Sequence, residues 1–458
     1  MWSTTSGQKS KSTKPDSSKS LDEVITLHHH HHTDYVEVVS AQGPATLSSK
    51  WRGIFILLIV IGFGAFAYQA FLNEGSERIG WIAFLHNFYF FTGLSAAGVV
   101  VAAIIQVTRA FWGRPIKRFA EAAGAFLPVS ILCLVVLYFG AEHLYEWIDY
   151  PPPAGGNKAI WLQKDFMFAR VILALCLLTW LAHLFSKTSL RADMGLAHEK
   201  HPEHWPQPAN WQGLEAEVAK GQQRQSKLGV FYCFAFAFII SLLAYDLIMS
   251  LDYHWISTMF GGWNFTSFML LAWGSLVLIS HFMSKRFGVD HYIHRLTYHD
   301  LGKLTFGFTV VWGYLFFAQY NVIWYGNLPH ETGYLLTRYY DPAWRPISLV
   351  VFAMVFLLPF TIGLSKKIKM SPKTFAPVVL ISFLGIWLER FILIAPSTWY
   401  FNRHEMAFEA GVGQLLVFDV LVFLGFFGLW ALLFTRRLYR YPVMVISDPK
   451  LDQGINRH

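Results

Sequence analysis

Acidic and basic side chains occur inside long apolar stretches of this sequence, where each is costly unless it is paired or hydrated. With a rise of about 1.5 Å per helical residue, many of them fall within roughly 10 Å of the same boundary of their apolar stretches. Acids and bases from several helices at one level are typical of a place where protons and a polar ligand head group meet. The candidates in this layer are His86, Glu142, His143, Arg170, Asp246, Glu389, Arg390 and Asp419.

Proton transfer is the chemistry that these residue types favour. A carboxyl group accepts a proton near neutral pH when burial raises its pKa, and a neighbouring guanidinium limits that rise. We expect this role chiefly for Glu142 and Asp246, with Arg170 beside them, because short acidic side chains cannot reach water from a turn or more inside a helix. The alternative is structural: the charges extend to the membrane surface, and Glu389 with Arg390 belongs to a salt bridge.

Cysteines and clustered histidines do not predict a metal site. Cys133, Cys176 and Cys233 lie in apolar stretches without CxxC spacing, so we expect neither a disulfide framework nor an iron–sulfur cluster held by this chain. The run His28–His32 is consecutive and is typical of low complexity or of a tag-like insertion. Prolines between His198, His201 and His204 predict an extended solvated loop, so no metal is assigned there.

The composition indicates a protein with several membrane spans. The chain has 458 residues, of which 54% are hydrophobic and only 14% are charged, against about 25% charged in a soluble domain. The net charge of +8 does not indicate a nucleic-acid partner, because Lys and Arg lie between apolar stretches and not on one basic face. The arrangement of the chain in a lipid bilayer, with Lys and Arg in the loops between membrane spans, accounts for nearly all of these residues.

Apolar runs of about twenty residues mark ten predicted membrane helices. The fold class is therefore an all-α integral membrane protein with both termini on one side. We expect a flexible tail over 1–50, a membrane domain over 51–440 with a long connecting loop over 187–227, and a second tail over 441–458. The runs are 54–72, 81–107, 125–147, 166–186, 228–250, 265–283, 304–323, 347–364, 375–395 and 413–434.

Lys and Arg alternate in number between successive loops. The segments on the side of the termini carry twenty-nine of them, and the loops on the other side carry six. This bias places the tails and basic loops in the cytoplasm. Toward that side lie four further polar candidates for a proton path, although polar groups inside membrane helices also serve packing. They are Gln106, Glu121, His183 and His281.

Two stretches suggest an internal repeat. AEHLYEWIDYPP at 141–152 and AQYNVIWYGNLP at 318–329 share an alanine, a tryptophan and the final proline, and Glu142 is matched by Gln319. Both lie at the end of a span, and interfacial helix ends favour Trp, Tyr and Pro in any case. We expect two parallel four-helix bundles, made of spans two to five and six to nine, with spans one and ten beside them.

Several segments together resemble the NrfD/PsrC family of quinol-interacting membrane subunits. They are 81–129, the AEHLYEW that follows at 141–147, LGIWLERFILIAPS at 384–397 and LYRYPV at 438–443. Within this family the similarity is greatest to the second such subunit of bacterial alternative complex III.

The resemblance implies a membrane subunit of an oxidoreductase that passes electrons from quinol to cytochrome c or to another periplasmic acceptor. The subunit is expected to interact with menaquinol or ubiquinol, to transfer protons, or to do both. Its implied partners are a sister NrfD-like subunit, an iron–sulfur subunit, multihaem cytochrome c subunits and other small membrane subunits. Haem c and iron–sulfur clusters belong to those partners, and this chain is expected to bind no cofactor of its own.

Two other functions compete with this one. In a di-haem cytochrome b, His86 with His143 and His183 with His281 would be the axial ligands, but no helix carries two histidines at the spacing of stacked haems. A secondary transporter with a parallel repeat would have a pair of helices broken by Gly or Pro at the membrane midplane, which the spans lack.

Overall fold

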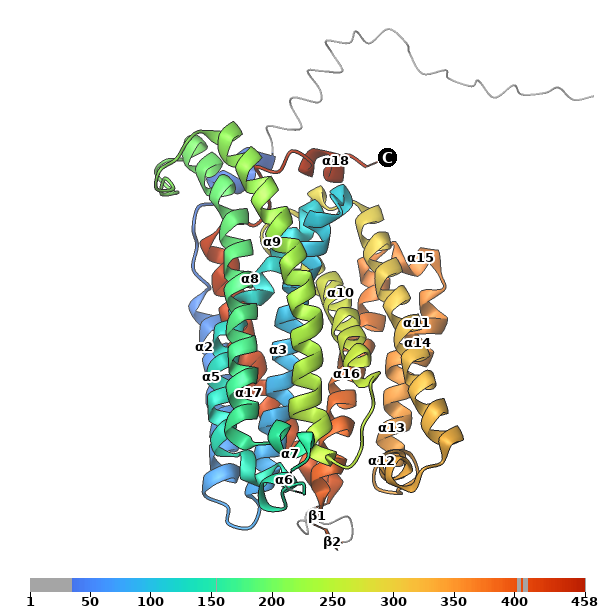
Figure 1. Cartoon of the computed structure of the whole chain (residues 1–458). Helices are drawn as coiled ribbons and strands as arrows, with labels where there is room; N and C mark the ends of the chain where they lie inside the picture. Colours follow the sequence, from blue (N-terminus) through green and yellow to red (C-terminus); the bar gives the residue numbers. More distant parts are fainter. Residues whose placement is uncertain (1–34, 154, 402–404, 407–410, 458) are drawn as a thin grey trace, which may run out of the picture.

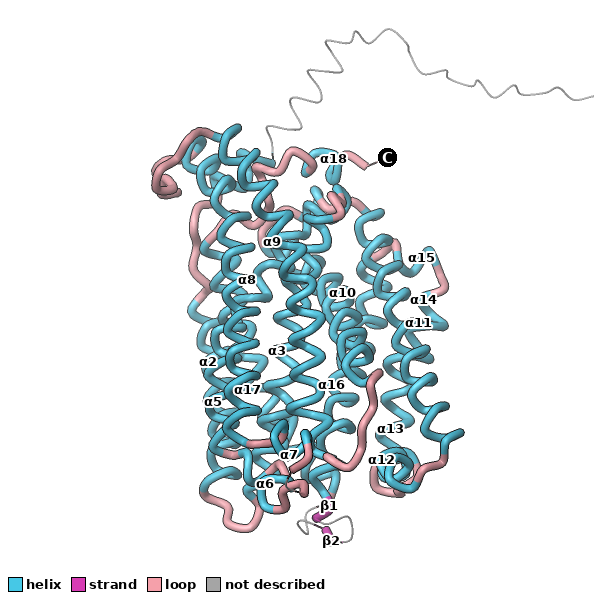
Figure 2. Tube along the Cα trace, in the orientation of Figure 1, coloured by secondary structure: helices cyan, strands magenta, loops and turns pink. Residues whose placement is uncertain are grey.

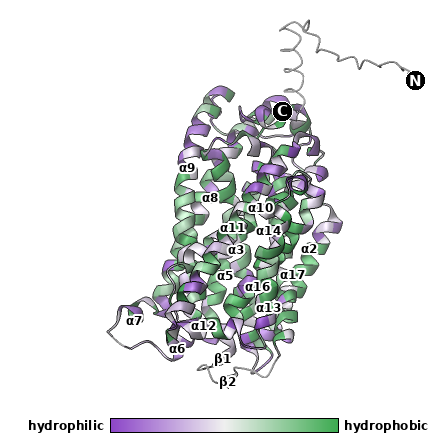
Figure 3. Cartoon of the chain, turned by 90° about the vertical axis from the view of Figure 1, so that its right-hand side faces the viewer, coloured by the Kyte–Doolittle hydropathy of each residue, from purple (hydrophilic) through white to green (hydrophobic). Residues whose placement is uncertain are grey.

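The structure, a computed structural model, describes residues 35–153, 155–401, 405–406 and 411–457 (Figure 1). The run His28–His32 lies outside them. The described residues contain ten helices long and apolar enough to cross a membrane, which confirms the predicted number of spans and the all-α class. Hydrophobic residues fill the middle of the molecule and hydrophilic ones gather at its two ends, as expected for a chain whose backbone groups must be satisfied within helices inside a bilayer (Figure 3).

The spanning helices begin and end close to the predicted runs. They are α2 (Ser49–Phe71), α3 (Glu77–Val107), α5 (Leu127–Phe139), α8 (Lys164–Lys200), α9 (Leu214–Leu243), α10 (Phe260–Arg286), α11 (Arg295–Gly326), the pair α13 (Arg345–Phe352) and α14 (Leu358–Gly363), α16 (Pro372–Trp399) and α17 (Val412–Arg440). One π-helical turn, η4 (Ala244–Ile248), extends α9, and another, η7 (Ala353–Leu357), joins α13 to α14. Tyr400–Phe401 and Glu405–Met406 form a short antiparallel strand pair, β1 and β2.

Shorter helices lie at the two ends, where the loops also gather (Figure 2). We call the end that carries the segments rich in Lys and Arg the basic end, and the other the opposite end. At the basic end are η1 (Phe111–Ile116), α4 (Lys117–Ala122), η2 (Ala123–Phe126), η6 (Asp290–Tyr292), α15 (Lys366–Lys369) and α18 (Leu451–Ile455). At the opposite end are η3 (Ala141–His143), α6 (Glu146–Asp149), α7 (Asn157–Trp161), η5 (Met249–Asp252) and α12 (Pro329–Tyr339).

Contacts between helices follow the predicted repeat. α3, α5, α8 and α9 contact one another in a ring, and α10, α11, α13–α14 and α16 form a second ring in the same order. α3 lies between the rings, since it also contacts α10 and α16, and nearly all of its side chains are buried. The central helix is therefore the element on which buried polar side chains from both rings converge.

The flanking helices α2 and α17 cross closely because each has a glycine at the crossing point, Gly62 in α2 and Gly425 in α17. A Cβ atom placed on Gly62 would lie 2.4 Å from the Cα atom of Gly425, so no larger residue fits without separating the backbones. Small residues of this kind are a common means of packing helices in membranes. The pair covers one side of α3, as expected for spans outside the two bundles.

The predicted tails are more structured than expected. Residues 35–41 are helical, and Tyr35, Val39 and Ser40 are buried, so the expectation of a flexible tail over 1–50 is wrong from residue 35 onward. At the other terminus Met444 and Leu451 are buried, and α18 packs on η1. Both described ends lie at the basic end, as an even number of spans requires (Figure 1).

The predicted loop over 187–227 is mostly helix. α8 continues to Lys200 and α9 already begins at Leu214, so only residues 201–213 connect them. A helix that leaves the bilayer no longer needs apolar side chains, and the polar ends of α8 and α9 therefore do not appear as part of an apolar run.

Candidate functional site

Six of the eight predicted residues form three pairs, two between oppositely charged side chains and one between a histidine and an aspartate that share a hydrogen bond. The pairs join Arg170 to Asp246, Glu389 to Arg390 and His86 to Asp419. Counted along their helices, the last two pairs lie about 10–15 Å from the opposite end. Ionisable side chains are costly in the low-dielectric interior of a membrane, and pairing of this kind is what makes their burial there possible.

The Arg170–Asp246 pair joins α8 to the end of α9. Arg170 donates from Nε and Nη2 to the two carboxylate oxygens of Asp246 at 2.7 and 2.8 Å, and the indole of Trp161 donates to Asp246 Oδ1 at 2.9 Å. Asp246 is completely buried, whereas the Arg170 side chain is 14% exposed. The buried Nη1 atom of Arg170 has no hydrogen-bond partner among the described residues, which leaves its two N–H groups as donors for a ligand or water.

Local backbone geometry and two aromatic rings position this pair. Asp246 lies in the π-helical turn η4, and such turns are frequent at functional sites because the extra residue redirects the side chains that follow. The guanidinium of Arg170 stacks over the ring of Trp161 at 3.8 Å and over that of Phe166 at 4.9 Å. Both rings are about half exposed, so the pair lies just beneath the surface of the molecule at the opposite end.

Glu389 lies between the helices of the second ring. Its Oε1 atom accepts hydrogen bonds from Ser267 Oγ at 3.0 Å and from the indole of Trp312 at 2.8 Å, and its Oε2 atom accepts from Arg390 Nη2 at 2.6 Å. Arg390 also donates to Asn264, which accepts a second bond from Tyr89 of α3. This network therefore connects α16 and α10 to the central helix.

His86 and Asp419 share a proton between α3 and α17. His86 Nδ1 lies 2.5 Å from Asp419 Oδ2, and His86 Nε2 lies 2.8 Å from the carbonyl oxygen of Trp387. A carbonyl only accepts, so Nε2 carries a hydrogen and the proton between Nδ1 and the carboxylate belongs to the pair. Both ring nitrogens are engaged, so His86 presents no free nitrogen to a haem iron, as the di-haem alternative would need.

Asn87 fixes the orientation of this pair. Its amide nitrogen donates to Asp419 Oδ1 at 2.7 Å, and its amide oxygen accepts from the indole of Trp387 at 3.0 Å. His86, Asn87 and Asp419 are all completely buried. Sequence reasoning did not identify Asn87, although a polar residue next to His86 in an apolar run is a signal that could have found it.

Glu142 and His143 do not join the buried groups, and the expectation that Glu142 lies a turn or more inside its membrane helix is wrong, because it follows that helix in the short η3. α5 ends at Phe139, where Gly140 packs against Trp81 so closely that a Cβ atom would lie 2.1 Å from the indole. Glu142 is 63% exposed and accepts a hydrogen bond from Lys164 at 2.8 Å. That bond holds the pKa of Glu142 below its usual value, so it is a poor proton acceptor near neutral pH. His143 is exposed and stacks on Trp81.

A larger polar network is buried at the basic end. Gln106 accepts hydrogen bonds from Arg114 at 2.5 Å and Lys117 at 2.6 Å, and Arg118 pairs with Glu121 and Asp193. Residues 108–119 belong to the basic segments that the Lys and Arg count assigns to the side of the termini, and the side chains of Arg114, Lys117 and Arg118 are at most 4% exposed. Acids from distant segments neutralise two of them, since Asp193 of α8 pairs with Arg118 and Asp448 lies 2.7 Å from Arg114. Lys117 lies 3.8 Å from Glu121 of its own helix.

The other two candidates on this side are not part of that network. His183 is exposed on α8, and His281 is partly exposed and contacts Lys285. The described side chains therefore place Gln106 and Glu121 together but give no continuous ladder through His183 and His281.

The opposite end also has a cavity with an acidic lining. Its volume is about 440 Å³, and its lining includes Glu146, Asp252 and Asp341 together with Arg338. Arg338 was not predicted as a site residue. It is buried and donates from Nε to the carbonyl of Ile392 at 3.0 Å, a carbonyl left without its helical partner because Pro396 has no N–H.

An apolar groove of about 340 Å³ lies among α2, α3, α10, α16 and α17, lined by residues such as Phe91, Phe383 and Trp430. None of the three buried pairs lines it, so it provides no acid–base group.

Comparison with known proteins gives one partial match. No protein-family model matches the chain. Over 95 residues the chain is 32% identical to a protein of Halobacterium salinarum named as a putative membrane subunit of dimethyl sulfoxide reductase. The match covers 20% of this chain and 20% of that protein, so the chain spans about a fifth of the length of this relative. The chain is thus similar, over part of its length, to a membrane subunit of an oxidoreductase.

Proposed function

We propose that this chain is an NrfD/PsrC-like membrane subunit of a quinol-oxidising complex of the alternative complex III type, in the position of the ActF subunit. Its partners are a sister NrfD-like subunit, an iron–sulfur subunit, multihaem cytochrome c subunits and smaller membrane subunits. It lies in a bacterial inner membrane with the basic end in the cytoplasm. The similarity to an oxidoreductase membrane subunit and the ten-helix architecture support this proposal.

The observation that carries the functional part is the Arg170–Asp246 pair. A quinol that loses two electrons to partner subunits must also lose two protons. A carboxylate held beneath the surface receives such a proton, and the adjacent N–H of Arg170 Nη1, which has no partner among the described residues, is a donor for the oxygen of the head group. The chain's own contribution is therefore to orient the head group and to accept its proton, while partners accept the electrons.

The His86–Asp419 pair extends the same role inward. With one proton between them the two groups are neutral together, and release of that proton alone would leave the Asp419 carboxylate charged and unpaired in the membrane. The pair can therefore pass a proton on only when another proton reaches it in the same step. Arg390, Asn264 and Tyr89 connect α3 to Glu389 at the same region of the central helix. We propose that these groups carry protons away from Asp246.

Substitution of Asp246 tests this function against a matched control. Asp246→Asn keeps the shape of the side chain but cannot be protonated, so quinol:cytochrome c turnover by the assembled complex should fall about tenfold, the lower range of an acid–base contribution. Glu142→Gln makes the same chemical change at an exposed acid and should leave turnover unchanged. Both complexes must first be shown to contain every subunit. Equal turnover in the two variants and the parent would assign the quinol chemistry to the sister subunit.

A further inference from the structure

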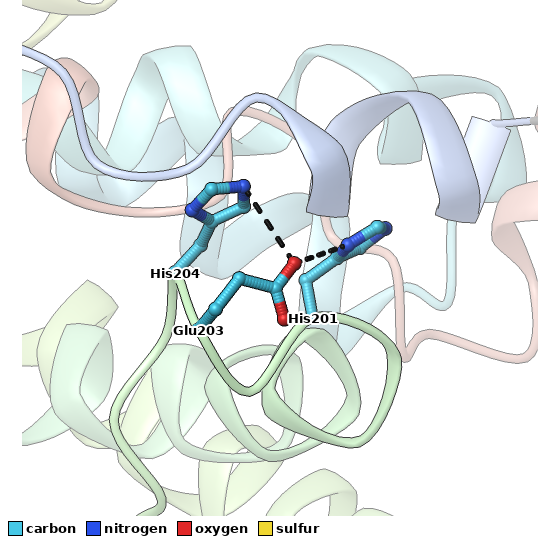
Figure 4. Close-up of side chains that lie close together, drawn as sticks. All are labelled: His201, Glu203 and His204. Atoms are coloured by element: carbon cyan, nitrogen blue, oxygen red, sulfur yellow. Dashed lines mark hydrogen bonds and ion pairs between the residues drawn. The ribbon is translucent and has the colours of Figure 1, made fainter.

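Three potential metal ligands lie together in the short connection between α8 and α9. His201, Glu203 and His204 offer nitrogen and oxygen atoms that all lie within 4.8 Å of one another, and the carboxylate of Glu203 lies between the two imidazoles (Figure 4). The sequence predicted an extended loop here, and that expectation is wrong for His201 and His204.

A proline causes the turn that brings them together. The backbone N–H of His204 donates to the carbonyl of His201 at 3.1 Å, which closes a four-residue turn with Pro202 in its second position. Proline favours that position because its fixed φ matches the turn. The residue that suggested an extended loop therefore folds His204 back toward His201.

The distances between the ligand atoms suit a tetrahedral ion. Glu203 Oε1 lies 3.0 Å from His201 Nδ1 and 3.7 Å from His204 Nε2. With metal–ligand bonds of about 2.0–2.1 Å, neighbouring ligand atoms of a tetrahedral zinc site are roughly 3.3–3.4 Å apart. The two observed distances lie on either side of this value, so small side-chain rotations would bring all three atoms onto one ion.

A second carboxylate supports the first histidine from behind. His201 Nε2 lies 2.9 Å from Glu37 Oε1, on the helical segment 35–41. A histidine that ligates a metal commonly donates its other ring N–H to a carboxylate, which fixes the ring and makes the ligand more basic. His201 thus directs Nδ1 to the cluster and Nε2 to Glu37, the arrangement found around protein metal ions.

The surrounding contacts hold the turn in place independently of any ion. The indole of Trp205 donates to the carbonyl of Ser40 at 2.7 Å, and His198 bonds to the carbonyl of Trp205 at 2.6 Å. The ring of His204 packs on Gly43, where an added Cβ atom would lie 3.2 Å from it. The three ligands therefore lie on a turn that is anchored on both sides and to the N-terminal segment.

We propose that His201, Glu203 and His204 bind a divalent transition-metal ion of the zinc class, with Glu37 orienting His201 and a fourth position open to water. Imidazole and carboxylate ligands at tetrahedral distances favour zinc over magnesium or calcium, which prefer oxygen ligands in larger numbers. Because Glu37 contacts the ligating His201, the ion would hold the helical segment 35–41 against the connection between α8 and α9.

Zinc titration of the full chain, followed by calorimetry, tests this site. The run His28–His32 would bind metal by itself, so the parent for all measurements carries serine at these five positions. We expect one tightly bound zinc per chain, loss of that binding in His204→Ala, and a 10–100-fold weaker affinity in Glu37→Gln, the usual effect of removing a carboxylate behind a ligating histidine. His291→Ala, an exposed histidine outside the cluster, is the control and should bind as the parent does.

Folding of the variants is checked by thermal unfolding without zinc, which should match the parent. X-ray absorption of the zinc-loaded parent should show two imidazole nitrogens on the ion. If the parent binds no zinc, or if His204→Ala binds it as tightly as the parent, the cluster is held only by hydrogen bonds between histidine and glutamate and the proposal is wrong.

Discussion

The buried Arg170–Asp246 pair predicts a strongly non-additive response to substitution. Arg170→Met removes both donated hydrogen bonds and leaves a fully buried carboxylate with the indole of Trp161 as its remaining side-chain donor. Removing one partner of a buried ion pair costs about 3–5 kcal/mol, so we expect a loss of stability of that order. The methionine keeps much of the apolar stem, so the loss reports the charge and not the packing.

Asp246→Asn should cost less than the arginine substitution. An amide oxygen in the place of Oδ1 still accepts from Arg170 Nη2 and Trp161, but the amide nitrogen then faces the Nε donor of Arg170. One charged hydrogen bond worth about 1.5–3 kcal/mol is therefore lost. Arg170 remains 14% exposed and stacked on Trp161, and water therefore replaces part of what it loses.

The double variant Arg170→Met with Asp246→Asn removes both charges together. Its free energy of unfolding should exceed the value expected from the two single losses by about 2 kcal/mol, within the range of coupling between contacting residues. The measurement is unfolding of the purified chain in mild detergent, followed by tryptophan fluorescence. Additive losses, or a loss below about 1 kcal/mol for Arg170→Met, would refute the reasoning, because such values belong to exposed pairs.

Three further outcomes are expected. Gly62→Leu should separate α2 from α17 and lower stability by about 1–3 kcal/mol in the same unfolding assay, whereas an unchanged transition would contradict the close crossing at Gly425. The pKa of the Glu142 carboxyl is lowered because Lys164 donates a hydrogen bond to it. The contact with Lys164 should therefore be present above the unfolded pKa of about 4.3 and be lost as the pH falls through the folded pKa. Infrared titration of the parent, with Glu142→Gln as the reference, checks this, and protonation of Glu142 above about pH 4.3 would show that its pKa is raised and not lowered. Reporters fused after Lys200 and after Lys366 should give cytoplasmic signals and one within residues 151–157 a periplasmic signal, since the Lys and Arg bias is twenty-nine to six; a cytoplasmic signal from 151–157 would invert the topology.

The spans and their repeat could be predicted because apolar length and the alternation of charge are local properties. The partners of the buried charges could not. Asp246 lies 76 positions from Arg170, and Asp419 lies 333 positions from His86, so no spacing rule connects them. Sequence reasoning placed these residues at one depth in the membrane. Which acid pairs with which base is determined by the packing of the two rings of helices around α3.

Two failures have specific physical causes. Glu142 was expected inside a span because the apolar run continues to Trp147, but Gly140 accommodates Trp81 and the helix ends before it. The basic residues of 108–119 were predicted only as part of a basic segment between two spans, and their burial was not foreseen, because the acids of α8 and of the C-terminal segment that neutralise Arg118 and Arg114 are distant in the sequence. A tail that folds back onto the membrane domain leaves no periodic signal in the sequence.

The central claim is that this chain belongs to a multi-subunit quinol-oxidising complex, and purification from its native membrane in mild detergent tests it most directly. The proposal predicts that an affinity-tagged chain brings with it a multihaem cytochrome c, visible by its haem absorbance, an iron–sulfur protein and a second NrfD-like chain in fixed proportion. The purified assembly should also oxidise a quinol with reduction of cytochrome c. A chain that elutes alone, without haem or iron from any partner, would contradict the proposed function.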